Sequence, residues 1–317
     1  MLRIISMFLV LLIHYIPQRE IPSSTSLANN PYDTLFNLKI KSICFVCVNC
    51  FVLISGYFGI RWKYKSFCNL IFQIFFWITL SYLIAICMGY THFGIKTFIQ
   101  NAVYGTIQRW FIIAYLGLYM MAPVLNSFLD NNSHKTILTL ILGFYGFSTV
   151  VGYLGTAPEF NRGMSTISLM GLYLIGAYIR RFPAYITKYN KYFYLTAYFS
   201  LGFLMVFISA LALKMSISQS PYGYLNPIII LESVALFIFF IKTKIPYSKQ
   251  INRIAASAFA VYLFHTNLFI YEHYQAACSQ IETDYNFAYG ILFMATVFTI
   301  SVLLDKGRIA LSKRIIR

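Results

Sequence analysis

The sequence predicts an all-α membrane protein, a polytopic bundle of about ten transmembrane helices that forms one domain over residues 1–317. Hydrophobic residues make up 59% of the chain and charged residues only 11%, whereas a soluble domain carries about 25% charged residues. The mean hydropathy of +0.68 and the aromatic content of 19% agree with this fold class. No soluble catalytic domain is visible, so we expect any chemistry to be performed by the membrane bundle itself.

The predicted spans are ten mainly apolar runs, each close to the length of about 20 residues that a membrane-crossing helix needs. The runs are 2–16, 40–60, 67–89, 110–128, 136–155, 165–179, 192–213, 226–241, 254–272 and 287–304. The first run reaches only about 24 Å as a helix, less than a hydrocarbon core of about 30 Å. We therefore expect it either to be buried within the bundle or to begin upstream of residue 1. It lacks a small-residue cleavage site, so we do not expect a removable signal peptide.

The basic residues predict the orientation of the bundle. The net charge is +16, which in a soluble protein would suggest nucleic-acid binding. Here the Lys and Arg residues lie in short loops between apolar runs, the arrangement of the positive-inside rule. With the N-terminus in the cytoplasm, 18 of the 25 basic residues fall inside. The seven outside are Arg19, Lys39, Lys41, Lys96, Arg109, Arg162 and Lys214. Both termini are therefore expected in the cytoplasm, and no nucleic-acid partner is expected.

Two polar side chains on the first run are the main functional candidates. Arg3 and His14 flank a stretch that is apolar except for one serine, and ionisable groups in a bilayer are costly and mark functional sites. Histidine can also exchange protons near neutral pH. Eleven residues of helix place the two side chains about 16 Å apart along the axis and within about 20° of one face. Glu232 and His265 lie in later apolar runs. Each is expected either to form a structural hydrogen bond between helices or to take part in a functional site.

Several other chemistries lack support in the sequence. HExxH, GxSxG and GxxxxGKS motifs are absent, so a zinc protease, a serine hydrolase and a P-loop ATPase are not indicated. Cys44, Cys47 and Cys50 are spaced by three within an apolar run. Because no fourth ligand is nearby, we interpret them as small buried residues on one helix face, and we expect no metal.

Four segments together resemble the acyltransferase-3 family, membrane-bound bacterial O-acyltransferases with ten helices. The first is the pair Arg3 and His14, which matches the family's R-x10-H signature. The others are FVLISGYFGI (51–60), with Ser55, Gly56 and Tyr57; WFIIAYLGLYMMAPVLN (110–126), with Trp110, Tyr115, Tyr119, Pro123 and Asn126; and ASAFAVYLFHTN (256–267), with Tyr262, Leu263 and His265. The segments follow the family's order and span nearly the whole chain.

The resemblance implies a multi-pass enzyme of the bacterial cell membrane that moves an acetyl or other acyl group. The donor would be cytoplasmic acyl-CoA, such as acetyl-CoA, and the acceptor a hydroxyl group of a surface polysaccharide or its lipid-linked precursor, with no permanently bound cofactor. Arg3 and His14 would be catalytic. The residues expected to bind substrate are Arg61, Lys63, Trp110, Tyr115, Glu232 and His265. Some members carry an R-x-x-R motif after the second span, whereas RWKYK (61–65) has a single Arg and offers lysines as point charges.

The residues leave several alternatives open. His14 either removes the proton of the acceptor hydroxyl group or carries the acyl group itself, and Arg3 either binds the donor or fixes the helix. Glu232 is a candidate to orient His14, and His265 a candidate donor lining the site. A transporter or flippase for a lipid-linked sugar is the main alternative function, although no inverted repeat or broken helix is visible. A structural subunit of an export complex is a third, but it does not explain why Arg3 and His14 share a helix face.

Overall fold

The computed structural model describes residues 1–16, 23–217 and 219–315, and these residues form helices, turns and loops without a strand. The predicted all-α fold class is therefore confirmed for the described part of the chain. Arg19, counted above on the outer side, lies outside it. The helices are α1 (Leu2–Tyr15), α2 (Ser24–Asn29), α3 (Pro31–Cys44), α4 (Cys47–Phe58), α5 (Tyr64–Cys87), α6 (Ile95–Gln108), α7 (Trp110–Asn131), α8 (His134–Phe147), η1 (Ser148–Leu154), η2 (Asn161–Gly163), α9 (Thr166–Arg181), α10 (Pro183–Ile186), α11 (Lys191–Lys214), α12 (Pro227–Lys242), α13 (Lys249–Ala256), α14 (Ala258–His265), α15 (Tyr271–Asp284) and α16 (Phe287–Ile315).

Six helical segments among the described residues are long and apolar enough to cross a membrane. They are Pro31–Phe58, which joins α3 and α4, Tyr64–Cys87, Trp110–Asn131, His134–Leu154, which joins α8 and η1, Lys191–Lys214 and Phe287–Ile315. The predicted short runs correspond to α1, α9 and α12, with 14, 16 and 16 residues. The chain is thus a multi-pass helical membrane protein.

The ninth predicted run, 254–272, is not one helix. The chain breaks at Ser257 between α13 and α14 and again after His265. At the second break the Asn267 side chain accepts a hydrogen bond from the Phe269 amide (3.1 Å). Side chains that bond locally to the backbone in this way favour turns, whereas hydropathy detects only that the surrounding residues are apolar. Helix α6 also lies in a segment that was predicted as a loop.

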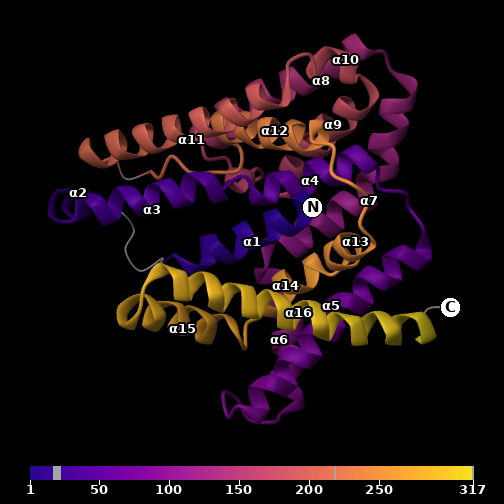
Figure 1. Ribbon diagram of the computed structural model, residues 1–317. Coiled ribbons are helices and arrows are strands. Elements are labelled where there is room, and N and C mark those ends of the chain that lie inside the picture. The colour runs from indigo at the N-terminus through magenta and orange to yellow at the C-terminus, as the bar shows by residue number, and fades with distance from the viewer. Residues whose placement is uncertain (17–22, 218, 316–317) are drawn as a thin grey trace.

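Helix α1 runs through the middle of the molecule (Figure 1). It packs against α3 and α4 on one side and against α14, α15 and α16 on the other. The N-terminal end of α1 is its right-hand end in Figure 1, and the C-terminus and the linkers 59–63 and 243–248 lie further to the right. The turn between α15 and α16 lies at the opposite end. A helix packed between neighbours on both sides does not need to cross the membrane by itself, which explains how α1 can be shorter than a span.

Glycine residues allow α4 and α9 to approach closely. A β-carbon added at Gly56 would lie 2.1 Å from the Tyr173 carbonyl oxygen, and one at Gly176 would lie 2.3 Å from the Leu53 carbonyl oxygen. Small residues at such contacts are typical of packed membrane helices. This pairing fixes α4, which forms one wall of the cavities described next.

Candidate functional site

Two histidines from distant parts of the sequence meet inside the bundle. His14 lies in the last turn of α1, and His265 is the last residue of α14. Nδ1 of His14 lies 3.0 Å from Nε2 of His265, within hydrogen-bond distance, and His265 is fully buried. Both histidines were predicted from the sequence as site residues, and the structure brings them together.

The hydrogen bonds of this pair assign the ring protons. Nδ1 of His265 lies 2.6 Å from the Val261 carbonyl oxygen, which can only accept, so this nitrogen carries a proton. A neutral imidazole has one ring proton, and a charged one is costly to bury. Nε2 of His265 is therefore an acceptor, and His14 donates to it from Nδ1. This leaves the lone pair of the His14 Nε2 atom free, with no hydrogen-bond partner among the described residues.

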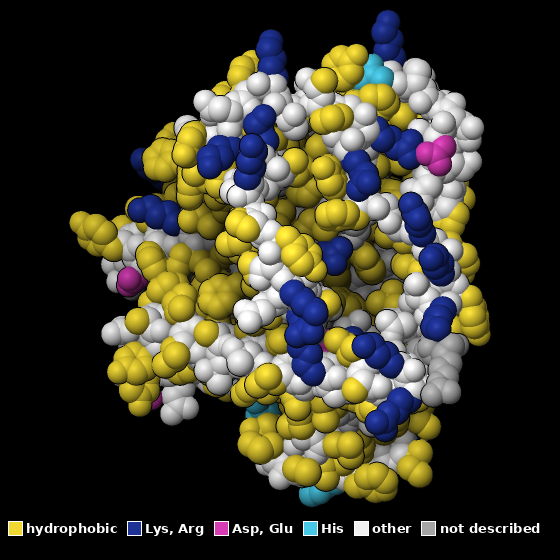
Figure 2. All heavy atoms as spheres, turned by 45° about the vertical axis from the view of Figure 1, so that its right-hand side comes forward, with side chains coloured by type: hydrophobic (Ala, Val, Ile, Leu, Met, Phe, Trp, Pro, Cys, Tyr) yellow, Lys and Arg dark blue, Asp and Glu magenta, His cyan; other side chains and the backbone are white. Residues whose placement is uncertain are grey.

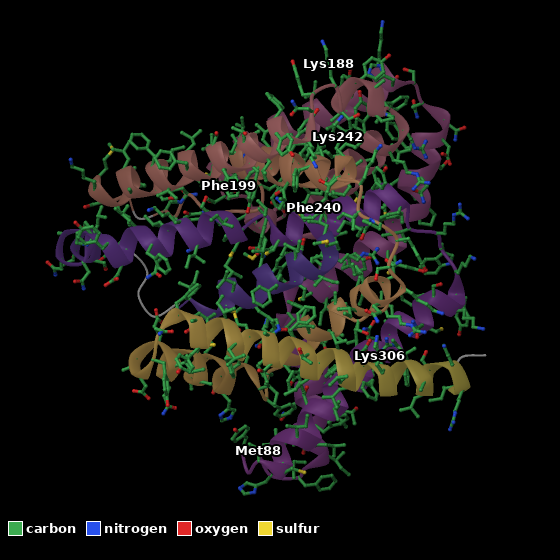
Figure 3. The ribbon with its side chains drawn as sticks, viewed as in Figure 1. Met88, Lys188, Phe199, Phe240, Lys242 and Lys306 are labelled. Carbon is green, nitrogen blue, oxygen red and sulfur yellow. The ribbon has the colours of Figure 1, made fainter. Side chains whose placement is uncertain are left out.

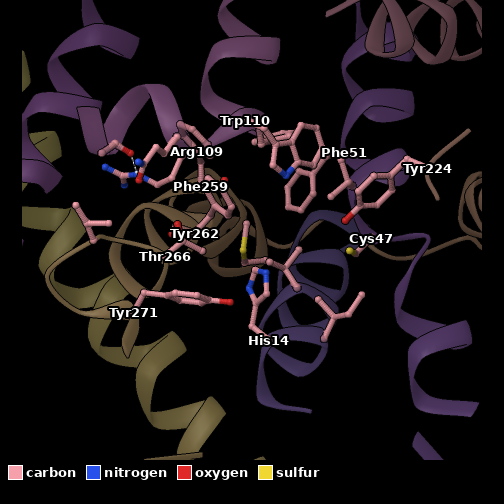
Figure 4. Close-up of a pocket in the computed structure, with 18 residues that line it drawn as sticks. His14, Cys47, Phe51, Arg109, Trp110, Tyr224, Phe259, Tyr262, Thr266 and Tyr271 are labelled. Atoms are coloured by element: carbon pink, nitrogen blue, oxygen red, sulfur yellow. Dashed lines mark hydrogen bonds between the residues drawn. The ribbon is translucent and has the colours of Figure 1, made fainter. Parts of the chain in front are cut away.

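His14 faces a cavity of about 390 Å³ that is mainly apolar and aromatic. Figure 4 shows His14 on one side of this space, with Trp110 across from it, Tyr224 to one side and Arg109 to the other. The remaining labelled lining residues are Cys47, Phe51, Phe259, Tyr262, Thr266 and Tyr271. A pocket of this size, with few polar groups among apolar walls, is typical of a small-molecule site. We call it the histidine cavity.

Arg109 belongs to the histidine cavity, a role that the sequence analysis missed. Its Nε atom donates to the Gly105 carbonyl (2.9 Å) and its Nη1 atom to the Leu263 carbonyl (3.4 Å). The guanidinium has five N–H donors, so donors remain for a bound molecule. The sequence placed Arg109 among the outer loop charges because an arginine before an apolar run is usually an interface residue. Only the packing of α6 and α7 with α14 in one hydrophobic cluster, and the bond from Arg109 to α14, reveal that it turns inward.

A second cavity, of about 550 Å³, lies at the N-terminal end of α1. It is lined by Arg3, by Tyr57 on α4, by Phe240 on α12 and by Asn252 on α13, among others. Helices α1 and α4 line both cavities. Arg3 on α1 and Tyr57 on α4 line this second cavity, and Met7 and Phe51 on the same two helices line the histidine cavity. We call this space the arginine cavity. Arg3 and His14 therefore occupy separate cavities along one wall.

Basic side chains surround the face on which the arginine cavity lies. Figure 2 shows Lys and Arg side chains around a recessed and mainly hydrophobic centre on this side of the molecule. The Arg180 guanidinium lies over the Tyr57 ring (5.6 Å to the ring centre), and Lys242, labelled in Figure 3, donates to the Thr187 carbonyl (2.6 Å). Arg61 and Lys63 are exposed in the linker between α4 and α5 and line none of the cavities described here.

Two further predicted residues lie outside both cavities. Tyr115 lies behind the wall of the histidine cavity, where its hydroxyl group bonds Ser55 (3.2 Å) and its ring stacks on Phe111 (5.7 Å). Glu232 lies elsewhere, on α12, and its carboxyl oxygens bond no described residue. The hypothesis that Glu232 orients His14 is wrong, because the partner of His14 is His265.

Comparison with protein families gives one finding. A family model described as an acyltransferase domain, Acyl_transf_3, matches residues 1–306 of the 317-residue chain. Comparisons with curated proteins and with solved structures give no match. The matched range includes the histidine pair, both cavities and the basic linkers.

Proposed function

Because the chain belongs to the acyltransferase-3 family, we propose that it is an O-acetyltransferase of the bacterial cell membrane. It takes an acetyl or related acyl group from cytoplasmic acyl-CoA and transfers it to a hydroxyl group of a surface polysaccharide or its lipid-linked precursor. The observation that carries the proposal is the free Nε2 atom of His14 in the histidine cavity, with Nδ1 held by His265. A general base needs this arrangement, one nitrogen oriented and the other available.

The proposed reaction is a direct acyl transfer. Nε2 of His14 removes the proton of the acceptor hydroxyl group as its oxygen attacks the thioester carbonyl. Arg109 donates hydrogen bonds to the oxyanion of the tetrahedral intermediate. The carbon–sulfur bond then breaks, and the proton held by His14 passes to the CoA thiolate. The products are the acyl ester and CoA, and His14 returns to its neutral form.

The alternative is a covalent step in which Nε2 of His14 attacks the thioester and carries the acyl group to the acceptor. The same free nitrogen serves both routes, so the geometry supports either. A trapped acyl-imidazole would distinguish them. In the covalent route, rapid quenching with labelled acyl-CoA and no acceptor leaves the label on a peptide containing His14, whereas direct transfer leaves none.

The proposed donor route begins at the basic face. Arg3 and the surrounding lysines and arginines attract the phosphates of CoA, and the acyl end passes from the arginine cavity toward the histidine cavity along α1 and α4. Arg61 and Lys63 contribute to the phosphate-binding surface from the linker after α4. This route needs the basic face to lie in the cytoplasm, which agrees with the predicted bundle of ten spans with both termini inside. The shared side of the N-terminus, C-terminus and basic linkers in Figure 1 supports that orientation.

The decisive experiment compares a strain lacking the gene with strains complemented by the wild type or by His14→Ala. We expect the deletion to remove acetyl groups from the surface glycan without removing the glycan, as measured by NMR of purified material. His14→Ala should fail to restore acetylation although the protein is present in the membrane fraction. Restored acetylation by His14→Ala would refute the assigned role, and loss of the glycan itself would favour a transporter or flippase.

A further inference from the structure

A buried carboxyl group on α12 has no hydrogen-bond partner among the described residues. Glu232 is fully buried, and neither of its carboxyl oxygens has a hydrogen bond with a described residue. The ion pairs that join Arg181 to Asp130 and Arg308 to Asp305 do not involve Glu232. An unpaired polar group inside a protein is costly unless something supplies a hydrogen bond or a charge.

The hydroxyl groups next to Glu232 already have other partners. The Ser42 hydroxyl group donates to the Gly202 carbonyl (2.7 Å), that of Tyr198 to the Ile43 carbonyl (2.9 Å) and that of Ser233 to the Ile229 carbonyl (2.6 Å). Each hydroxyl group has a single proton to donate. None of these three hydroxyl groups therefore has a proton left for Glu232, which leaves its oxygens open to a donor on a bound molecule.

Glu232 lines a cleft of about 510 Å³ between α3 and α11. Phe199 and Phe203 on α11 form part of its rim and are 54% and 70% exposed, and Figure 3 labels Phe199 on α11. Lys39 on α3 is an exposed residue of the same cleft. The cleft shares no lining residue with the histidine cavity or the arginine cavity. It is therefore a separate site.

The position of the cleft restricts the ligand. Helices α3 and α11 belong to segments long and apolar enough to cross a membrane, so exposed phenylalanines on such a segment face lipid. A cleft that opens between them is reached from the bilayer. We propose that it binds a membrane lipid whose hydroxyl or ammonium group donates a hydrogen bond to Glu232, with Lys39 near the lipid phosphate. A carboxyl group for the headgroup donor and a lysine for the phosphate together match a phospholipid. Binding of such a lipid does not depend on acyl transfer.

Gly202 provides room for the Glu232 carboxyl group. A β-carbon at Gly202 would lie 2.9 Å from Oε1 of Glu232 and 3.4 Å from the Ser42 hydroxyl oxygen. Gly202→Ala therefore displaces the carboxyl group without removing it. Gly143 on α8 is a matched control, because a β-carbon there meets nothing within 4 Å.

The test is native mass spectrometry of the full-length protein with equal amounts of three phospholipids. Phosphatidylethanolamine offers an ammonium donor, phosphatidylglycerol offers hydroxyl donors, and phosphatidylcholine has no N–H or O–H group in its headgroup. We expect the wild type to retain the first or second lipid about tenfold better than the third, the effect of one hydrogen bond to a charged group. Glu232→Leu and Gly202→Ala should lose that preference, whereas Gly143→Ala should keep it.

Two further variants complete the design. Glu232→Gln keeps a carbonyl acceptor but carries no charge. If the lipid preference survives in this variant, the donor is a hydroxyl group. If the lipid preference disappears, the donor is an ammonium group. His14→Ala should keep the lipid preference, which separates this site from the proposed transfer reaction. Equal retention of phosphatidylcholine by the wild type, or an unchanged preference in both Glu232→Leu and Gly202→Ala, would overturn the proposal.

Discussion

Replacing His265 with leucine tests whether this residue positions His14. The substitution keeps a side chain of moderate size in a fully buried site and removes the acceptor for the His14 Nδ1 proton. The ring of His14 then has no hydrogen bond to fix its rotation or its tautomer. His265→Gln is the matched variant, because its side-chain oxygen can stand near the position of Nε2 and accept the same proton.

The magnitude follows from what remains around His14. General base catalysis contributes about 10²–10⁴-fold to a rate, which bounds the loss for His14→Ala. In His265→Leu the base is present, and its edge contact with the Tyr271 ring (5.7 Å between centres) still restrains it. We therefore expect a fall in kcat of about 100-fold, or about 2.7 kcal/mol in the activation free energy. His265→Gln should recover roughly tenfold of this loss through the restored acceptor, about 1.4 kcal/mol.

The assay uses purified protein in proteoliposomes with labelled acetyl-CoA and a purified glycan acceptor. We expect kcat to change and the KM for acetyl-CoA to stay nearly constant, because His265 does not line the arginine cavity. Wild-type kcat in His265→Leu would refute the positioning role. Equal losses in the leucine and glutamine variants would refute the claim that the accepted hydrogen bond is the relevant interaction.

Three further predictions concern the site and its supports. Arg109→Gln should lower kcat by about 10²–10³-fold in the same assay if Arg109 stabilises the oxyanion; an unchanged kcat would exclude that role. Gly176→Val should lower the thermal unfolding midpoint in detergent, because its side chain meets a carbonyl of α4, whereas Gly146→Ala, with open space around it, should not. Asp305→Asn leaves the buried Arg308 guanidinium without its carboxylate partner, at a cost of about 3–5 kcal/mol; the same unfolding assay measures it, and an unchanged midpoint would contradict it.

Much of the fold follows from long apolar runs. The predicted runs 67–89, 110–128 and 192–213 match α5, α7 and α11 within a few residues, since few structures other than a helix can satisfy the backbone in lipid. Hydropathy fails where a helix breaks inside an apolar stretch, as it does between α13, α14 and α15. The second break is accompanied by a local hydrogen bond from the Phe269 amide to the Asn267 side chain, which an average over residues does not detect.

Only part of the candidate site could be predicted from the sequence. His14 and Trp110 were predicted as site residues, and they share one cavity. The bond between His14 and His265 joins residues 251 positions apart, so it depends on how α1 packs against α14, which composition does not specify. Glu232 was a candidate to orient His14 because it is an isolated carboxylate in an apolar run. Helix α12 packs against α11 and α4, and this packing gives Glu232 a separate cleft.

The spacing of Arg3 and His14 acquires a structural meaning from the two cavities. Met7 and Val10 lie between them on the same stripe of α1 and line the histidine cavity, whereas Arg3 lines the arginine cavity. Three helical turns therefore separate the proposed donor entrance from the proposed base by about 16 Å. One additional residue between Arg3 and His14 would turn His14 by about 100° relative to Arg3, away from both the cavity and His265. The number of residues between Arg3 and His14 therefore sets both the distance between the two side chains and the direction in which His14 points. A requirement for distance alone would not explain this exact spacing.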